Sequence, residues 1–225
     1  MTKPYLDYSA VETGPNPTVS IIWMHGLGDH GSSFVPLVKE FDLSKCPSIR
    51  FLFPHAPERP VTANNGYEMS AWFDIVAGFE AGDFEDIAGI KESQGYIEQL
   101  IAHEEASGIK PEKIILAGFS QGCAMALHTA LRHPEKLGGI IGLSGYIPLI
   151  HSLDAERNAA NQDTPIFLAH GKIDQVVPFE RAQDAHAKLQ SLGYNVEWHE
   201  YQMMHTIDMA EINDISAWLT KVLAS

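Results

Sequence analysis

Short, continuously apolar runs alternate with longer amphipathic stretches along most of this chain. Apolar runs without polar alternation are typical of parallel strands, because such strands are covered on both faces. We therefore predict strands at 19–24, 49–53, 114–118, 139–145, 165–171 and 195–201.

Helical periodicity fills several segments between these runs. The stretch 87–106 places Ile90, Ile97 and Ile101 on one side of a long amphipathic helix. We predict further helices at 121–132, at 180–192 and near the C-terminal end, where apolar residues share one face at Ile212, Ile215, Leu219 and Val222.

The alternation of strands and helices predicts an α/β fold. Its doubly wound, mostly parallel sheet would carry helices on both faces, with no large lid domain. Internal repeats and linkers are missing from the sequence, so we expect a single domain over residues 1–225. The stretch 61–86 has no clear periodicity and contains Gly66, Gly78 and Gly82. We interpret it as an irregular flap beside the site that opens and closes.

Composition narrows the class of protein. The 225 residues are 45% hydrophobic and 20% charged, which is typical of a globular chain. A net charge of -14 disfavours nucleic acid and anionic membranes as partners. No apolar run is long enough for stable membrane insertion, and residues 1–5 lack a signal-peptide core. We expect a cytoplasmic protein, either a monomer or a homodimer.

The segment Gly118-Phe119-Ser120-Gln121-Gly122 carries the strongest local signal for chemistry. It follows a predicted strand and precedes a predicted helix, which is the setting of a nucleophile elbow. Glycine on each side lets backbone segments approach closely at a sharp turn. The turn would expose the Ser120 hydroxyl and leave the Gln121 amide at a helix N-terminus, where it can stabilise an oxyanion.

An acid and a base occur where such a serine needs them. Ligand sites in open α/β sheets form at the carboxyl ends of strands. Asp174 follows the predicted strand 165–171, and His205 follows 195–201. A serine hydroxyl needs a base to remove its proton, and a carboxylate orients the imidazole that does so. We therefore predict Ser120 as nucleophile, His205 as base and Asp174 as acid.

The other histidines need separate explanations, because the chain has 11 of them. His199 falls within a predicted strand and is expected to be packed or on the surface. Histidines on predicted helices, or at their ends, are expected to face solvent: His128, His133, His151 and His186. Those at strand ends are expected to be structural, with an accessory role left open: His25, His55 and His170.

A second oxyanion donor is expected from the loop after the strand 19–24. This loop reads His25-Gly26-Leu27-Gly28-Asp29, and its glycines allow close approach to a substrate oxygen. We predict the backbone amide of Leu27 as the donor that acts with the amide of Gln121. A phosphate-binding loop is the alternative, but the spacing differs from that of a P-loop. No metal-ligand spacing occurs either.

Several blocks together resemble the phospholipase/carboxylesterase family: 25–29, 53–57, 69–74, 118–122 and 170–178. The resemblance extends from about residue 18 to the C-terminus. It implies an α/β-hydrolase fold, no metal or organic cofactor, and hydrolysis of carboxylic esters or acyl thioesters, with a small-molecule ester or acyl thioester as the expected substrate. It also implies the roles given above for Ser120, Asp174, His205, Leu27 and Gln121. Trp72 is carried over as a substrate-pocket wall, with a buried anchor as the alternative.

Some positions depart from the family pattern. Met204 stands where glycine commonly precedes the catalytic histidine, and a bulky residue there could narrow the pocket. Tyr146 stands where related thioesterases often carry tryptophan, and Thr2 removes a palmitoylation site found in animal thioesterases. These differences favour a serine carboxylesterase of bacterial type acting on short-to-medium acyl chains. An acyl-protein thioesterase or lysophospholipase, and a non-hydrolytic ligand receptor, remain alternatives.

Overall fold

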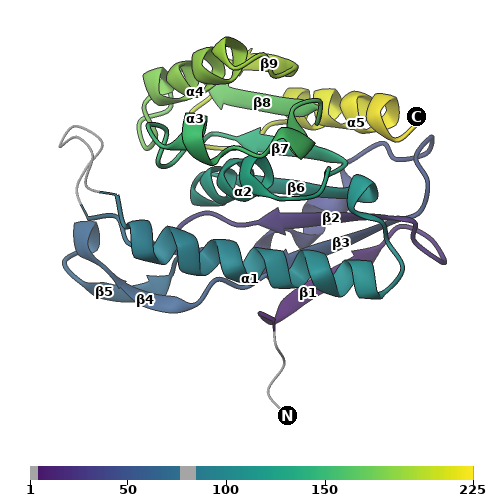
Figure 1. Ribbon diagram of the computed structural model, residues 1–225, viewed down its shortest axis with the longest axis horizontal. Coiled ribbons are helices and arrows are strands. Elements are labelled where there is room, and N and C mark those ends of the chain that lie inside the picture. The colour runs from purple at the N-terminus through teal and green to yellow at the C-terminus, as the bar shows by residue number, and fades with distance from the viewer. Residues whose placement is uncertain (1–4, 77–84, 225) are drawn as a thin grey trace.

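Parallel strands form the centre of the molecule (Figure 1). The structure is a computed structural model that describes residues 5–76 and 85–224. Within these residues the strands of the main sheet follow the order β1-β3-β2-β6-β7-β8-β9, from bottom to top in Figure 1. Neighbouring strands pair in parallel except β1, which is antiparallel to β3. The strands are β1 Tyr8–Glu12, β2 Val19–Met24, β3 Ile49–Pro54, β6 Ile114–Phe119, β7 Gly139–Leu143, β8 Ile166–Gly171 and β9 Val196–Tyr201.

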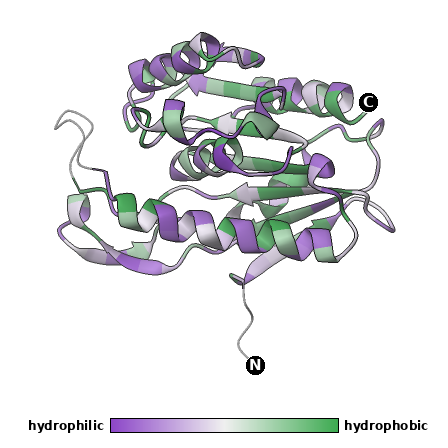
Figure 2. Cartoon of the chain, viewed as in Figure 1, coloured by the Kyte–Doolittle hydropathy of each residue, from purple (hydrophilic) through white to green (hydrophobic). Residues whose placement is uncertain are grey.

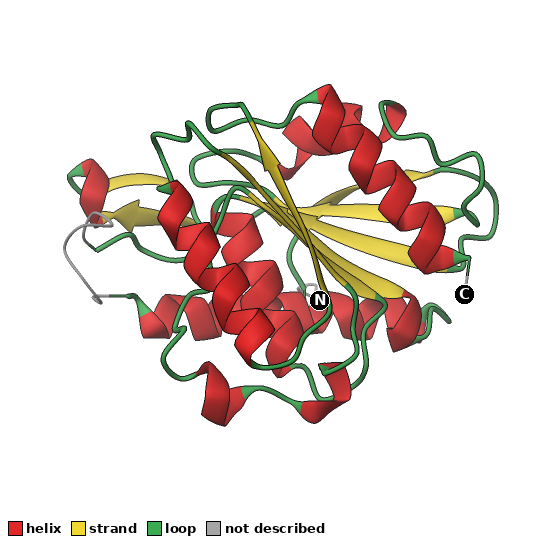
Figure 3. Cartoon of the chain, turned by 90° about the horizontal axis from the view of Figure 1, so that it is seen from above, coloured by secondary structure: helices red, strands yellow, loops and turns green. Residues whose placement is uncertain are grey.

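Helical segments cover both faces of this sheet (Figure 3). One face packs against α1 Ile87–Ala106, α2 Gln121–Arg132 and α4 Phe179–Ser191. The other face packs against α5 Met209–Leu223 and the 3-10 segment η1 Gly31–Lys39. A short helix, α3 Leu153–Glu156, and two 3-10 turns, η3 Pro111–Lys113 and η4 Ala159–Asn161, lie in the connections. The predicted doubly wound α/β architecture is confirmed, whereas the single-domain organisation stays a prediction.

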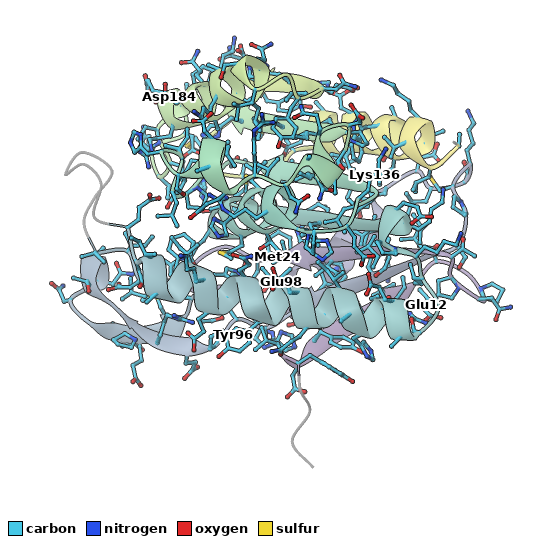
Figure 4. All side chains as sticks on the ribbon, viewed as in Figure 1. Glu12, Met24, Tyr96, Glu98, Lys136 and Asp184 are labelled. Carbon is cyan, nitrogen blue, oxygen red and sulfur yellow. The ribbon has the colours of Figure 1, made fainter. Side chains whose placement is uncertain are left out.

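The predicted central strands are found because burial on both faces removes polar alternation. All residues of β2 and β8 are buried, and the central strands are predominantly apolar in Figure 2. Figure 4 shows Met24 of β2 behind α1, in the interior, and Asp184 of α4 at the outer edge. β7 ends at Leu143 rather than at residue 145, because Ser144 turns the chain with a φ of 50°.

The stretch 61–86, which the sequence predicts to be irregular, contains part of a β-hairpin. The prediction is therefore wrong for the first residues of this stretch. β4 Glu58–Val61 and β5 Tyr67–Ser70 pair antiparallel, joined through the 3-10 turn η2 Thr62–Asn64. Asn65 and Gly66 both have positive φ, 57° and 74°, and asparagine and glycine tolerate this conformation best. The hairpin lies at one end of the molecule, beside the start of α1 (Figure 1). Gly78 and Gly82 lie outside the described residues, and the proposed movement of the flap stays a prediction.

The environment of α2 corrects two histidine predictions. His128 is fully buried and His133 is 6% exposed, although both were expected to face solvent. All residues from Gln121 to Leu131 are buried, because α2 packs against β6 and β7 on one side and against α1 on another. His128 Nε2 lies 3.0 Å from Gln94 Oε1 of α1, and burial lowers the pKa of His128 to about 3. A central helix has no polar face, so its histidines cannot be assigned from periodicity alone.

Candidate active site

Ser120 occupies a strained turn between β6 and α2. Its φ of 57° and ψ of -118° are rare for a residue with a side chain. The Ser120 N–H donates to the carbonyl of Leu143 over 2.8 Å, which ties the turn to the adjacent strand. The sequence predicts this strand-turn-helix arrangement, and the structure confirms it.

The flanking glycines are required by close backbone contacts. A Cβ atom at Gly118 would lie 2.2 Å from the carbonyl carbon and oxygen of Gly122. A Cβ atom at Gly122 would lie 2.2 Å from the backbone oxygen of Met24 on the neighbouring strand. Separations this short are far inside van der Waals contact, so any side chain at either position would displace the elbow.

Asp174 and His205, 31 residues apart in sequence, are brought together. The distance from His205 Nδ1 to Asp174 Oδ2 is 2.7 Å. Asp174 Oδ1 accepts from the backbone N–H groups of Val176 and Val177 over 2.8 and 2.9 Å. The carboxylate is fully buried, and the His205 side chain is 15% exposed. These contacts fix the imidazole with Nδ1–H toward Asp174, which leaves Nε2 free for proton transfer.

The loops that carry these residues converge with the elbow. The rings of His205 and Phe119, the residue before Ser120, have centroids 4.7 Å apart. On the other side of the elbow, a Cβ atom at Gly26 would lie 3.4 Å from the Cβ atom of Ser120. The carboxyl ends of β2, β6, β8 and β9 therefore supply one site, as expected for an open α/β sheet.

The loop after β2 is held by internal hydrogen bonds. His25 Nε2 accepts from the Ala56 N–H over 3.1 Å, so its Nδ1 carries the proton and donates to the Gly26 carbonyl over 2.7 Å. Burial lowers the pKa of His25, which favours this neutral form. Gly28 has a φ of 73°, and its N–H donates to the Ser70 carbonyl over 2.8 Å. His25 thus has the predicted structural role.

Of the two predicted oxyanion donors, Gln121 belongs to the elbow and Leu27 follows Gly26, which packs against Ser120. Leu27 is half-buried between the two glycines of the loop after β2. Gln121 is the first residue of α2, so its backbone N–H has no carbonyl partner within the helix. Oxyanion binding by these two amides stays a prediction.

Trp72 joins the loop after β2 to the elbow. Its indole N–H donates to the His25 carbonyl over 2.9 Å, and its backbone N–H donates to Gln121 Oε1 over 2.8 Å. Gln121 Nε2 in turn donates to the Phe73 carbonyl over 2.7 Å. Trp72 is fully buried and hydrogen-bonded through both its indole and its backbone, as the anchor alternative expects, and its role as a pocket wall stays a prediction. Its size and polar N–H suit this position, and the sequence carries no signal for the role of the Gln121 side chain.

The two remaining pocket candidates have different surroundings. Tyr146 is 6% exposed, and the guanidinium of Arg181 lies 4.9 Å from the centre of its ring. Met204 is 62% exposed on the loop before His205. Their contact with substrate stays a prediction.

His170 lies beside Asp174 and contacts the same loop. Its Nε2–H donates to the Val177 carbonyl over 3.0 Å and lies 3.4 Å from Asp174 Oδ2. Burial lowers the pKa of His170, so the ring is neutral near physiological pH. This agrees with the structural role expected for it. The hydrogen bond from His170 to Val177 also orders the segment whose backbone N–H groups donate to Asp174.

Two further features of the described residues bear on function. Across residues 5–76 and 85–224, no cluster of three or more His, Cys, Asp or Glu side chains is arranged to hold a metal ion. None of the helices in that same part of the chain is long and apolar enough to cross a membrane.

Comparison with known proteins places the chain among hydrolases. A family model described as phospholipase/carboxylesterase matches residues 6–223. Acyl-protein thioesterase 1 of Yarrowia lipolytica is 40% identical over 206 residues, which cover 90% of this chain and 91% of that protein. Carboxylesterase SOBER1 of Arabidopsis thaliana is 36% identical over 205 residues and 90% of each chain.

Solved structures show the same likeness over nearly the whole chain. The crystal structure of Arabidopsis thaliana SOBER1 has a TM-score of 0.85 at 35% identity, covering 91% of this chain and 99% of that one. The crystal structure of Zea mays acyl-protein thioesterase 2 has a TM-score of 0.86 at 30% identity, covering 97% of this chain and 100% of that one.

Proposed function

Because the chain belongs to the phospholipase/carboxylesterase family of carboxylic ester hydrolases and has their α/β-hydrolase fold, we propose that it is a serine carboxylesterase acting through an acyl-enzyme on Ser120. Its substrates are carboxylic esters of short-to-medium acyl chains. The observation that carries the proposal is the 2.7 Å hydrogen bond between His205 and Asp174 beside the strained elbow of Ser120.

Acylation begins with proton transfer from Ser120. His205 Nε2 accepts the hydroxyl proton while Oγ attacks the acyl carbonyl carbon. Asp174 keeps Nδ1 protonated and stabilises the imidazolium that forms, since its Oδ2 accepts from Nδ1–H. The carbonyl oxygen becomes an oxyanion, which the backbone N–H groups of Leu27 and Gln121 bind.

Collapse of the tetrahedral intermediate releases the alcohol and leaves the acyl group on Ser120. The bond from the carbonyl carbon to the leaving oxygen breaks, and His205 Nε2 gives its proton to that oxygen. In deacylation, His205 removes a proton from water, whose oxygen attacks the acyl-enzyme. The carboxylic acid departs, and His205 returns the proton to Ser120.

Substitution of the nucleophile tests the proposal. Ser120→Ala should lower kcat on p-nitrophenyl acetate by several orders of magnitude, because the alanine cannot form the acyl-enzyme. Ser191→Ala, on the surface of α4, is the matched control and should keep wild-type activity. Activity of Ser120→Ala within tenfold of wild type would exclude the assigned nucleophile.

A fluorophosphonate probe separates hydrolysis from simple ligand binding. Folded wild-type protein should be labelled at Ser120, because the probe reacts with an activated serine hydroxyl. Intact, folded protein that is not labelled would instead support a ligand receptor on a hydrolase fold.

Acyl thioesters are the second candidate substrates. The observation that favours them is 40% identity to acyl-protein thioesterase 1 of Yarrowia lipolytica. Lysophospholipids could be cleaved by the same three residues. Matched esters and thioesters of increasing acyl length, compared by kcat/KM, will rank these substrates.

A further inference from the structure

A mostly apolar groove opens directly beside the proposed base. We call it the His205 groove; it has a volume of about 420 Å³ and lies between η1 and the loop that follows β9. Its apolar lining comes from both sides and from the strand before the elbow, at Phe34, Pro36, Leu37, Phe119 and Ile207. A volume of roughly 300–1,000 Å³ and an apolar lining are typical of small-molecule sites.

Aromatic contacts connect this groove to the reacting atoms. The Phe119 ring lies 4.7 Å from the His205 ring and 6.1 Å from the Phe34 ring, measured between centroids. The residue after Phe119 is Ser120 itself, and the groove is lined by His205 and Thr206. A molecule in the groove would therefore contact Phe119, at the end of β6 directly before Ser120, and also the proposed base His205.

The position of His205 decides which half of an ester the groove can hold. In the tetrahedral intermediate, the oxyanion points to the amides of Leu27 and Gln121. The leaving oxygen must point to His205 Nε2, because it receives its proton there. The acyl chain takes the remaining direction, away from His205. A cavity walled by His205 is thus on the side of the leaving group.

The charges along the groove restrict that leaving group further. Among the described residues that line it, Glu40 supplies a carboxylate, and no lysine or arginine takes part. The chain as a whole has a net charge of -14. The Glu40 carboxylate and the negative net charge both repel anions, so an alcohol that carries a phosphate would bind poorly.

We propose that the His205 groove binds the alcohol half of the substrate, and that this alcohol is apolar and carries no negative charge. The inference rests on the proposed esterase function and makes it more specific. It favours esters of hydrocarbon alcohols over lysophospholipids, whose leaving alcohol carries a phosphate.

A series of acetate esters tests the groove while the acyl group stays constant. With unbranched primary alcohols from ethanol to octanol, kcat/KM of the wild type should rise by roughly two- to fourfold per methylene until the groove is filled. Ser33 is exposed and lines the groove, so Ser33→Trp should fill it without disturbing the core. We expect the octyl-to-ethyl ratio of kcat/KM to fall at least tenfold in this variant.

The matched control places the same side chain elsewhere. Ile87→Trp, at a half-exposed position on the first turn of α1 that lines another cavity, should keep the wild-type octyl-to-ethyl ratio.

A variant with a changed charge in the groove adds a second readout. Glu40→Lys should raise kcat/KM at least threefold for the acetate ester of glycerol phosphate relative to butyl acetate.

Two results would overturn the assignment of the groove. One is an alcohol series that is flat in the wild type. The other is a Ser33→Trp variant in which kcat/KM for ethyl esters depends less on acyl length than it does in the wild type. The groove would then hold the acyl chain. Failure of the proposed function looks different: the wild type would neither hydrolyse any acetate ester nor react with a fluorophosphonate at Ser120.

Discussion

The backbone of Ser120 predicts an unusual result: the protein with glycine at this position should be more stable than the protein with alanine there. The φ of 57° and ψ of -118° lie outside the regions that residues with a Cβ atom favour, whereas glycine adopts such angles readily. A residue held in a sparsely populated region stores about 1–3 kcal/mol. Ser120→Gly releases this strain, and Ser120→Ala retains it while removing the same hydroxyl.

The difference between the two variants isolates the strain. Glycine costs about 0.5–1 kcal/mol relative to alanine through the entropy of the unfolded chain. The net expectation is a glycine variant more stable than the alanine variant by up to about 2.5 kcal/mol. For a chain of this length, that corresponds to a Tm higher by up to about 10 °C. Urea unfolding followed by circular dichroism measures the free energy, and thermal unfolding checks the shift.

A second substitution guards against a general effect of glycine. Ala187 is exposed within α4 and helical, so Ala187→Gly should destabilise the protein by about 0.5–1 kcal/mol. A Ser120→Gly protein that is less stable than Ser120→Ala would refute the reasoning, since the elbow would then hold no releasable strain.

Two further predictions concern buried polar groups. Burial raises the pKa of Glu211, on the first turn of α5, to about 8 from an ordinary 4.5. Between these values the folded state binds more protons than the unfolded state, so the free energy of unfolding should fall as pH rises from about 4.5 to 8, by at most about 5 kcal/mol. Glu211→Gln should flatten this dependence in urea titrations at several pH values. Trp72→Phe removes the indole donor to the His25 carbonyl and should lower kcat on p-nitrophenyl acetate about tenfold, with KM changed little. An unchanged kcat would mean that the anchor does not position the loop after β2.

Sequence patterns predict the parts of the fold in which burial is uniform. β2 and β8 are buried throughout, and their apolar runs have no other explanation in a chain of this kind. β1 and the β4–β5 hairpin consist almost entirely of half-buried and exposed positions over few residues, so periodicity does not reveal them. The Asn65-Gly66 pair is the local signal that indicates the hairpin turn.

The candidate site divides in the same way. Ser120, Asp174 and His205 can be predicted because each follows a recognisable strand, and parallel strands end at one edge of the sheet. The anchor role of Trp72 and the burial of His128 depend on contacts between distant segments. The His205 groove combines residues of η1 with the loop after β9, and a 3-10 segment has no strong sequence pattern of its own.

The anchor at Trp72 has a consequence for how this protein can diversify. Ser70 and Trp72 fasten the end of the β4–β5 hairpin to the loop after β2 and to Gln121. Mutations farther out on the hairpin act beyond this attachment point. The outer hairpin can therefore accumulate changes in length and composition while the reacting groups keep their geometry. Substitutions confined to the outer hairpin should therefore leave the hydrogen bonds of Trp72 to His25 and Gln121 in place.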